Sequence, residues 1–156
     1  MKALARLAVV GLALLAGCSS LGGGKDNEPA MITDANVNRI QDREWVLKSL
    51  QIDGRQVVMD LDANMTLKFG ADGKASGFGS VNQFSGGYSF SPNAQLAWGR
   101  PGLVTTRRAG PPELMEKERV YLEAITKTSR AILKGHALQL QSDDGSTVLP
   151  FIEAGY

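Results

Sequence analysis

The chain has 156 residues, with 17 lysine and arginine residues against 16 aspartate and glutamate residues, one histidine and one cysteine. This near balance gives no basis for binding nucleic acid, because phosphate backbones are met by a clustered excess of Lys and Arg. A single cysteine also excludes an intramolecular disulfide, so a domain of this size must be stabilised by its core.

The N-terminal residues 1–17 are typical of a secretory signal peptide. Lys2 and Arg6 precede an apolar run over residues 7–16. The run is about half of the ~20 residues needed to span a bilayer. We therefore predict that this segment is processed rather than kept as a membrane span.

Cys18 directly follows Leu15, Ala16 and Gly17, and these four residues resemble the bacterial lipobox. In proteins with a lipobox, a signal peptidase cuts before the cysteine, whose sulfur carries diacylglycerol and whose new amino terminus is acylated. The alternative is an ordinary secretory signal with an incidental cysteine, which explains the small residues but not the position of the thiol. Because more than one acyl chain makes anchoring stable, Cys18 is the predicted lipidation site and the membrane is the predicted partner.

The residues after Cys18 indicate which membrane holds the anchor. Ser19 and Ser20 stand where enteric lipoproteins of the inner membrane carry an aspartate. The resemblance therefore implies the periplasmic face of the outer membrane.

Residues 18–40 are predicted to form a tether. This stretch contains Gly22, Gly23 and Gly24 among charged residues and Pro29, with little apolar periodicity before Ile32. About eighteen flexible residues have a root-mean-square span of roughly 20–25 Å, which would hold a domain just off the lipid headgroups. An ordered terminal extension is the alternative.

From Glu44 onward, short runs rich in Val, Leu, Phe and Tyr are separated by turn pairs, which predicts antiparallel strands. Two Asp-Gly pairs, at residues 53–54 and 72–73, predict hairpins. The predicted strands cover Trp45 to Leu50, Val57 to Met59, Met65 to Phe69, Ala75 to Phe78, Phe84 to Phe90 and Leu96 to Trp98.

The period of the pattern changes after Pro111 and Pro112. Leu114, Glu118 and Ile125 recur at helical spacing, which predicts a helix over 112–127 that begins at the two prolines. Strands are predicted again over 131–133, 138–140 and 148–152.

These elements predict an α+β fold that is mainly β. A curled antiparallel sheet or a small barrel with one covering helix would bury the apolar stripe of the helix and protect the edges of the sheet.

Several motifs follow one another in order from the first strand to the last. They are Trp45 to Leu50, Thr66 to Phe69, residues 77–88, residues 105–111, Glu118 and Leu122 in the helix, and Leu138, Leu140 and Phe151. Together they resemble the META/HslJ-like domain of heat-inducible bacterial lipoproteins. The resemblance assigns residues 41–156 to this domain.

The chain departs from the family pattern at both of its usual cysteines. Ser80 or Val81 stands at the first position and Gly110 at the second, while Arg108 replaces an apolar residue. Because both cysteines are absent together, the domain lacks a disulfide that would stabilise it by about 2 to 4 kcal/mol, and no unpaired reactive thiol is left. The expected fold is therefore unaffected, and a cysteine-based activity of the domain is excluded.

The sequence offers no catalytic set, metal site or cofactor motif. His136 lies in a predicted turn without a Ser or Cys that spacing connects to it, and zinc needs several Cys or His ligands. Residues 60–64 are similar to the first half of a calcium loop, but Met65 and Ala71 stand at its glycine and closing glutamate. We predict no catalytic residues, no metal and no cofactor.

The candidate ligand-facing patch consists of Asn82, Phe84, Ser85 and Tyr88. Glycines at 77, 79, 86 and 87 surround it, and glycines in strands also mark bulges or bends. A purely structural role for this region is therefore the alternative. Arg100, Arg107 and Arg108 form either a solvated loop or a contact for an acidic partner or lipid headgroups.

The expected function is that of a non-enzymatic, outer-membrane-anchored lipoprotein of the bacterial envelope that contributes to stress tolerance or binds an envelope component. In the alternative, the barrel binds a lipid or a hydrophobic segment of an envelope protein, as a carrier or pilot-type chaperone. A less favoured alternative is a hydrolase that uses Ser85 or His136.

Overall fold

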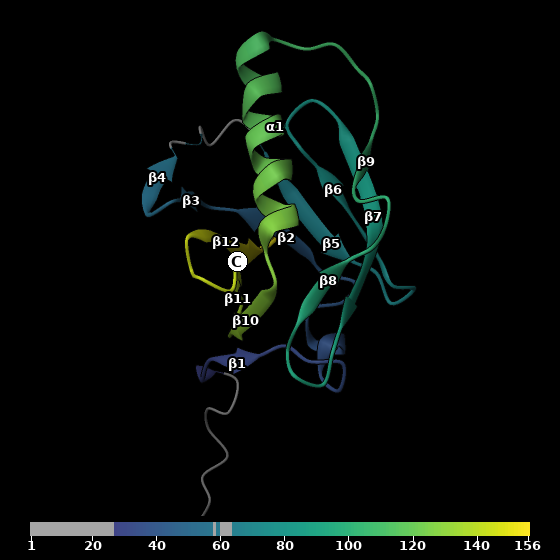
Figure 1. Ribbon diagram of the computed structural model, residues 1–156, viewed down its shortest axis with the longest axis vertical. Coiled ribbons are helices and arrows are strands. Elements are labelled where there is room, and N and C mark those ends of the chain that lie inside the picture. The colour runs from purple at the N-terminus through teal and green to yellow at the C-terminus, as the bar shows by residue number, and fades with distance from the viewer. Residues whose placement is uncertain (1–26, 58, 60–63) are drawn as a thin grey trace, which may run out of the picture.

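The computed structural model describes residues 27–57, 59 and 64–156 (Figure 1). Within these residues, one helix and a short 3₁₀ turn accompany a single curled sheet. The helical elements are α1 (Pro112–Lys127) and η2 (Val37–Arg39). The strands are β1 (Ala30–Met31), β2 (Glu44–Leu47), β3 (Leu50–Ile52), β4 (Arg55–Val57), β5 (Thr66–Phe69), β6 (Lys74–Phe78), β7 (Gln83–Phe90), β8 (Leu96–Trp98), β9 (Val104–Thr105), β10 (Arg130–Lys134), β11 (Ala137–Gln141) and β12 (Thr147–Glu153).

The sheet runs in the order β1-β10-β11-β12-β2-β5-β6-β7-β8, with β9 beside β7 and β3 beside β12 and β4. It curls so far that its two ends meet, since the backbone N–H of Leu96 in β8 donates to the carbonyl of Ser129, 2.7 Å away and directly before β10. The helix α1 packs along the open side of the curl (Figure 1). The predicted class, mainly β with a curled antiparallel sheet and one covering helix, is confirmed.

Local chemistry explains the hairpins. Asp53 and Gly54 both have positive φ, 51° and 73°, which is the backbone of the tight turn that Asp-Gly pairs favour between β3 and β4. In the β5–β6 turn, Asp72 accepts a hydrogen bond from the backbone N–H of Lys74 at 3.1 Å. The two hairpins predicted from Asp-Gly pairs are present.

The inside of the curl is filled by side chains. Trp45, Phe69, Tyr121 and Phe151 are fully buried there and are the largest of the buried residues. The helix contributes Tyr121, Ala124 and Ile125 from one face, as its apolar spacing predicts. No helix of the described chain has the length and hydropathy that crossing a membrane requires.

The boundary between tether and domain requires a correction. Ala30 and Met31 pair with β10, opposite Leu133 and Ile132. Ile32 and Ile40 are fully buried. Residues 30–40 therefore belong to the folded unit, which is the alternative of an ordered extension. Ile32 and Ile40 bury enough apolar surface to hold this segment against the sheet, although it has no regular apolar periodicity. The signal peptide and Cys18 lie outside the described residues and stay predictions.

Candidate functional site

The four residues of the predicted patch do not share a surface. Asn82, Phe84 and Tyr88 face the core and are at most 8% exposed, whereas Ser85 is exposed on the opposite face. The ring of Phe84 meets Tyr121 edge-on, and that of Tyr88 meets Phe69. Since side chains alternate along a strand, Asn82 and Tyr88 are separated from the outward-facing Ser85, whereas the edge of the buried Phe84 lines the same outer hollow as Ser85.

Asn82 serves as a junction in the fold. Its side-chain amide donates to Oε1 of the buried Glu118 at 2.8 Å. Its own N–H and that of Val81 donate to Oε2 of the same carboxylate at 2.6 and 3.0 Å. Its side-chain oxygen Oδ1 accepts hydrogen bonds from the Thr106 hydroxyl and the Arg108 backbone N–H at 2.8 and 2.7 Å. This pair, which we call the Asn82–Glu118 junction, joins α1, the β6–β7 turn and the loop after β9.

The two positions at which the family usually has cysteine lie side by side. A Cβ atom built on Gly110 would be 3.4 Å from Cβ of Val81 and 2.8 Å from its methyl groups. Disulfide-bonded residues have Cβ atoms about 3.5 to 4.5 Å apart. Val81 rather than Ser80 is therefore the residue opposite Gly110, and its methyl groups occupy the space that a crosslink would fill.

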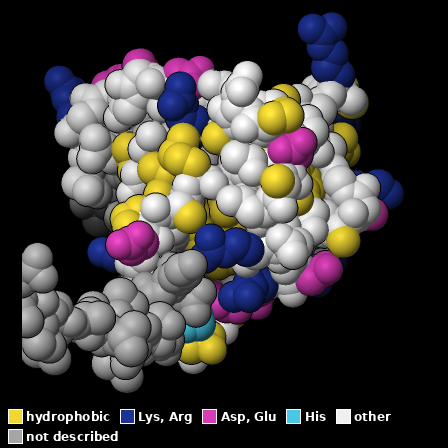
Figure 2. Space-filling view, turned by 90° about the horizontal axis from the view of Figure 1, so that it is seen from below, with side chains coloured by type: hydrophobic (Ala, Val, Ile, Leu, Met, Phe, Trp, Pro, Cys, Tyr) yellow, Lys and Arg dark blue, Asp and Glu magenta, His cyan; other side chains and the backbone are white. Residues whose placement is uncertain are grey.

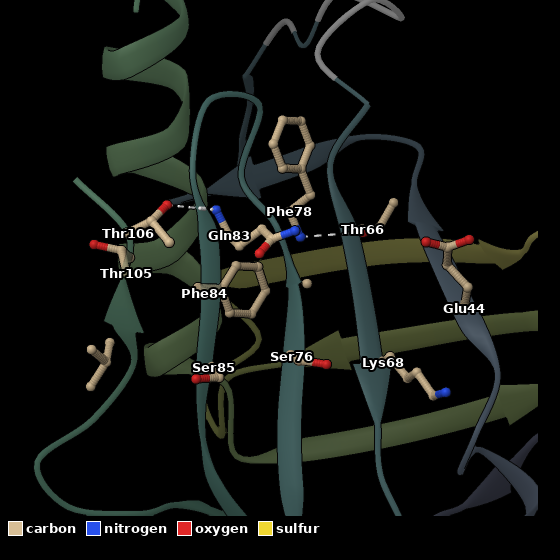
Figure 3. Close-up of a pocket in the computed structure, with 12 residues that line it drawn as sticks. Glu44, Thr66, Lys68, Ser76, Phe78, Gln83, Phe84, Ser85, Thr105 and Thr106 are labelled. Carbon is tan, nitrogen blue, oxygen red and sulfur yellow. Dashed lines mark hydrogen bonds between the residues drawn. The ribbon is translucent and has the colours of Figure 1, made fainter. Parts of the chain in front are cut away.

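A hollow on the outer face of the sheet is the best candidate for a binding site (Figure 3). Across β2, β5, β6, β7 and β9, one row of paired residues runs Glu44, Lys68, Ser76, Ser85 and Val104. The small serines leave a depression of about 580 Å³ between longer neighbours. The remaining lining comes from Thr66, Gly77, Phe78, Gln83, Phe84, Thr105 and Thr106.

Several polar side chains that line the hollow are available to bind a ligand. Thr66 and Thr106 accept hydrogen bonds from the backbone N–H groups of Phe78 and Gln83 (dashed lines in Figure 3). Within the described chain, no hydrogen bond engages the side chains of four other lining residues, namely Ser76, Gln83, Ser85 and Thr105. Hydroxyl and amide groups around the ring of Phe78 can bind a polar, uncharged ligand that has an apolar face.

The residues considered for hydrolysis lie apart. His136, in the turn between β10 and β11, places Nδ1 2.8 Å from Glu153 and stacks on the ring of Tyr156. This hydrogen bond lowers the pKa of the Glu153 carboxyl. Ser85 lines the hollow on the outer face, whereas His136 lies in a separate depression beside Arg39 and Arg43. The hydroxyl and the imidazole are therefore not assembled as nucleophile and base.

Metal-ligating residues are also dispersed. Across residues 27–57, 59 and 64–156, no cluster of three or more His, Cys, Asp or Glu side chains could hold a metal ion. Residues 60–63 of the calcium-loop-like segment lie outside the described residues. Arg100, Arg107 and Arg108 are exposed on the loops that flank β9.

Comparison with known proteins identifies relatives but no activity. The family model described as META domain matches residues 38–154. A protein from Burkholderia xenovorans, solved by NMR, is similar at 26% identity with a TM-score of 0.64, over 86% of this chain and 97% of that one. A second NMR structure is 25% identical with a TM-score of 0.55, over 80% and 97% of the two chains. A DUF4847 family protein from Bacteroides vulgatus, 10% identical with a TM-score of 0.55 over 74% and 95%, shares the fold alone. Curated proteins include no significant match.

We predict that Glu118→Gln destabilises the domain by about 2 to 3 kcal/mol, because the amide has one acceptor oxygen for three donors and points an N–H at one of them. Urea denaturation measures the change. Glu116→Gln on the same helix is the matched control, since its carboxylate is exposed and pairs with the exposed Arg119; its unfolding midpoint should stay at the wild-type value. Equal midpoints for both variants would contradict the role given to the junction.

We predict that the double change Val81→Cys with Gly110→Cys forms a disulfide and stabilises the oxidised domain by about 2 to 4 kcal/mol. Gly110→Cys alone should destabilise it, because the new Cβ would collide with the methyl groups of Val81. Thermal unfolding with and without reductant separates the two effects. If the thermal unfolding midpoint of the double variant is the same with and without reductant, the two positions are not in contact.

Proposed function

The chain belongs to the META domain family, and on this premise we propose that it is a non-enzymatic lipoprotein, held by acylated Cys18 on the periplasmic face of the outer membrane. Its domain binds a polar component of the bacterial envelope. The lipobox-like residues before Cys18 support the anchor. The hollow on the outer face of β5, β6 and β7 is the observation that supports binding.

The anchor keeps the domain close to the lipid. Because the sheet begins at Ala30, only eleven residues separate Cys18 from the first strand. A flexible segment of this length has a root-mean-square span of roughly 17–20 Å. The domain therefore works within about one domain diameter of the membrane surface.

The ligand we propose is a chain of sugars. Saccharides present many hydroxyl groups and an apolar ring face, which match the free hydroxyl and amide groups of the hollow and the ring of Phe78. A lipid-anchored domain that holds such a polymer ties two layers of the envelope together. This is the route by which we expect it to contribute to stress tolerance.

The packing favours this outer site over a lipid carried inside the barrel. The inner face of the sheet is occupied by fully buried aromatic and aliphatic side chains, among them Trp45, Leu67 and Phe151. An apolar ligand there would have to displace the core, at a cost of several kcal/mol for each large side chain moved. Ser85 and His136 line different depressions, which likewise supports binding rather than hydrolysis.

We predict that labelled palmitate enters the wild-type protein and that Cys18→Ala abolishes the label and releases the protein from the membrane fraction. Fractionation of cells after labelling measures both. Ser20→Ala is the control, and it should keep the label. Incorporation that survives Cys18→Ala would overturn the anchor.

We predict that the detergent-solubilised full chain sediments with isolated peptidoglycan and that Ser85→Trp weakens this binding at least tenfold by filling the hollow. Ser89→Trp is the matched control, because Ser89 is exposed on the same strand and does not line the hollow. Quantitative sedimentation gives the bound fraction. Failure of the wild type to sediment, or equal loss in both variants, would refute this ligand or this site.

A further inference from the structure

The outer face of β10, β11 and β12 is more apolar than an exposed sheet face normally is. Ile132, Pro150 and Ile152 point outward and are partly exposed, opposite in sense to the buried Leu133 and Phe151. An antiparallel sheet with one covered face usually places polar residues on the other. Together with Pro29 and Ala137, the three outward residues line a groove of about 330 Å³, which we call the apolar groove.

Positive charge lies on the rim of the apolar groove. Lys48 and Lys134 both line it and are exposed. In the part of the chain that the structure describes, neither lysine forms a salt bridge. The carboxylate of Glu153, which adjoins this end of the sheet, is already engaged by Arg43 and His136. Glu28 is exposed at the start of the described chain. Its single negative charge is smaller than the two positive charges of Lys48 and Lys134, so the net charge of these three side chains is positive.

The position of the apolar groove relative to the N-terminus identifies what it meets. Pro29 is part of the lining, so the chain that arrives from Cys18 enters beside the groove. Figure 2 shows this end of the molecule, where hydrophobic side chains gather next to Lys and Arg side chains. Ten residues separate Cys18 from Pro29, a span of roughly 16–19 Å for a flexible chain. This surface is thus the part of the domain that the anchor holds nearest to lipid.

We propose that the apolar groove docks on an anionic phospholipid bilayer. Its aliphatic side chains enter the boundary between headgroups and acyl chains, and Lys48 and Lys134 bind the phosphates, a combination of apolar area and cationic charge typical of surfaces that lie on membranes. The inference rests on the proposed function in that it takes the domain to be held at a membrane. It also orients the domain, because the polar hollow lies on β5, β6 and β7, farther round the curl, and stays clear of the lipid.

The test is a lysine footprint of the full chain on vesicles. Protein reconstituted into phosphatidylglycerol and phosphatidylethanolamine vesicles is acetylated with an amine-reactive ester, and mass spectrometry gives the rate at each lysine. We expect Lys48 and Lys134 to react at least fivefold more slowly than on phosphatidylcholine vesicles, whereas Lys74, which is highly exposed on the β5–β6 hairpin, reacts equally on both. Salt at 1 M should remove most of the difference in rate between the two kinds of vesicle, since it shortens the Debye screening length to about 3 Å.

Two variants test the chemistry of the apolar groove. Lys134→Glu changes an exposed position and should speed acetylation of Lys48 on anionic vesicles at least threefold without affecting folding. Ile132→Ser should do the same by removing apolar contact, and circular dichroism checks that it folds. Met115→Ser is the matched control, because Met115 is an exposed apolar residue on α1 that lines neither the hollow nor the apolar groove; its footprint should equal that of the wild type.

The outcomes separate this inference from the proposed anchor. The full chain attaches to vesicles through acylated Cys18 or through its apolar residues 7–16, so the footprint does not depend on acylation. Equal rates at Lys48, Lys134 and Lys74 on anionic vesicles would overturn the docking and leave the palmitate result standing. Protection that rises with protein concentration would assign the apolar groove to a second copy. Protection of Lys48 and Lys134 that is the same at every lipid charge and salt concentration would mean that the N-terminal segment covers the apolar groove. Either result would overturn the proposal.

Discussion

The carboxylate of Glu118 connects parts of the chain that are far apart in sequence. It accepts hydrogen bonds from Val81 and Asn82 in the β6–β7 turn, and Asn82 in turn holds the loop that leads from β9 toward α1. A buried carboxylate is tolerated only when donors surround it, so the turn, the loop and the helix must form together. Gly79 adds a steric condition, because a Cβ atom there would lie 2.7 Å from the Glu118 side chain.

Because α1 and the packed core cover the inner face of the sheet, the surfaces left for binding lie on its outer face. The inner face is closed by packed side chains, and both of the surfaces that we assign to binding are on the outer face. They differ in chemistry along the sheet: small hydroxyl residues on β6 and β7 form the hollow, whereas aliphatic residues on β10 and β12 form the apolar groove. Curvature turns these two surfaces in different directions, so one domain can rest on lipid and still present a polar site.

Local signals in the sequence predicted most of the fold. The Asp-Gly pairs located two hairpins, and the shift from period two to helical spacing after Pro112 located α1. The strands β1 and β9 have two residues each, which is too short for a periodic signal, and only their partners explain them. Burial of Ile32 and Ile40 is a tertiary effect for the same reason.

The candidate site was harder to predict than the fold. Period two alone separates the even-numbered Asn82, Phe84 and Tyr88 from Ser85, and this signal could have divided the proposed patch. The pairing of Ser85 with Ser76 and Val104 depends on register between strands, which the sequence of one strand does not specify.

The contact of Val81 with Gly110 has a consequence for how the protein matures. Where relatives can carry a covalent bridge, this chain has aliphatic packing, which forms as soon as the two segments meet. Folding therefore requires no oxidant and no thiol exchange catalyst, and the finished domain is indifferent to the redox state of its surroundings.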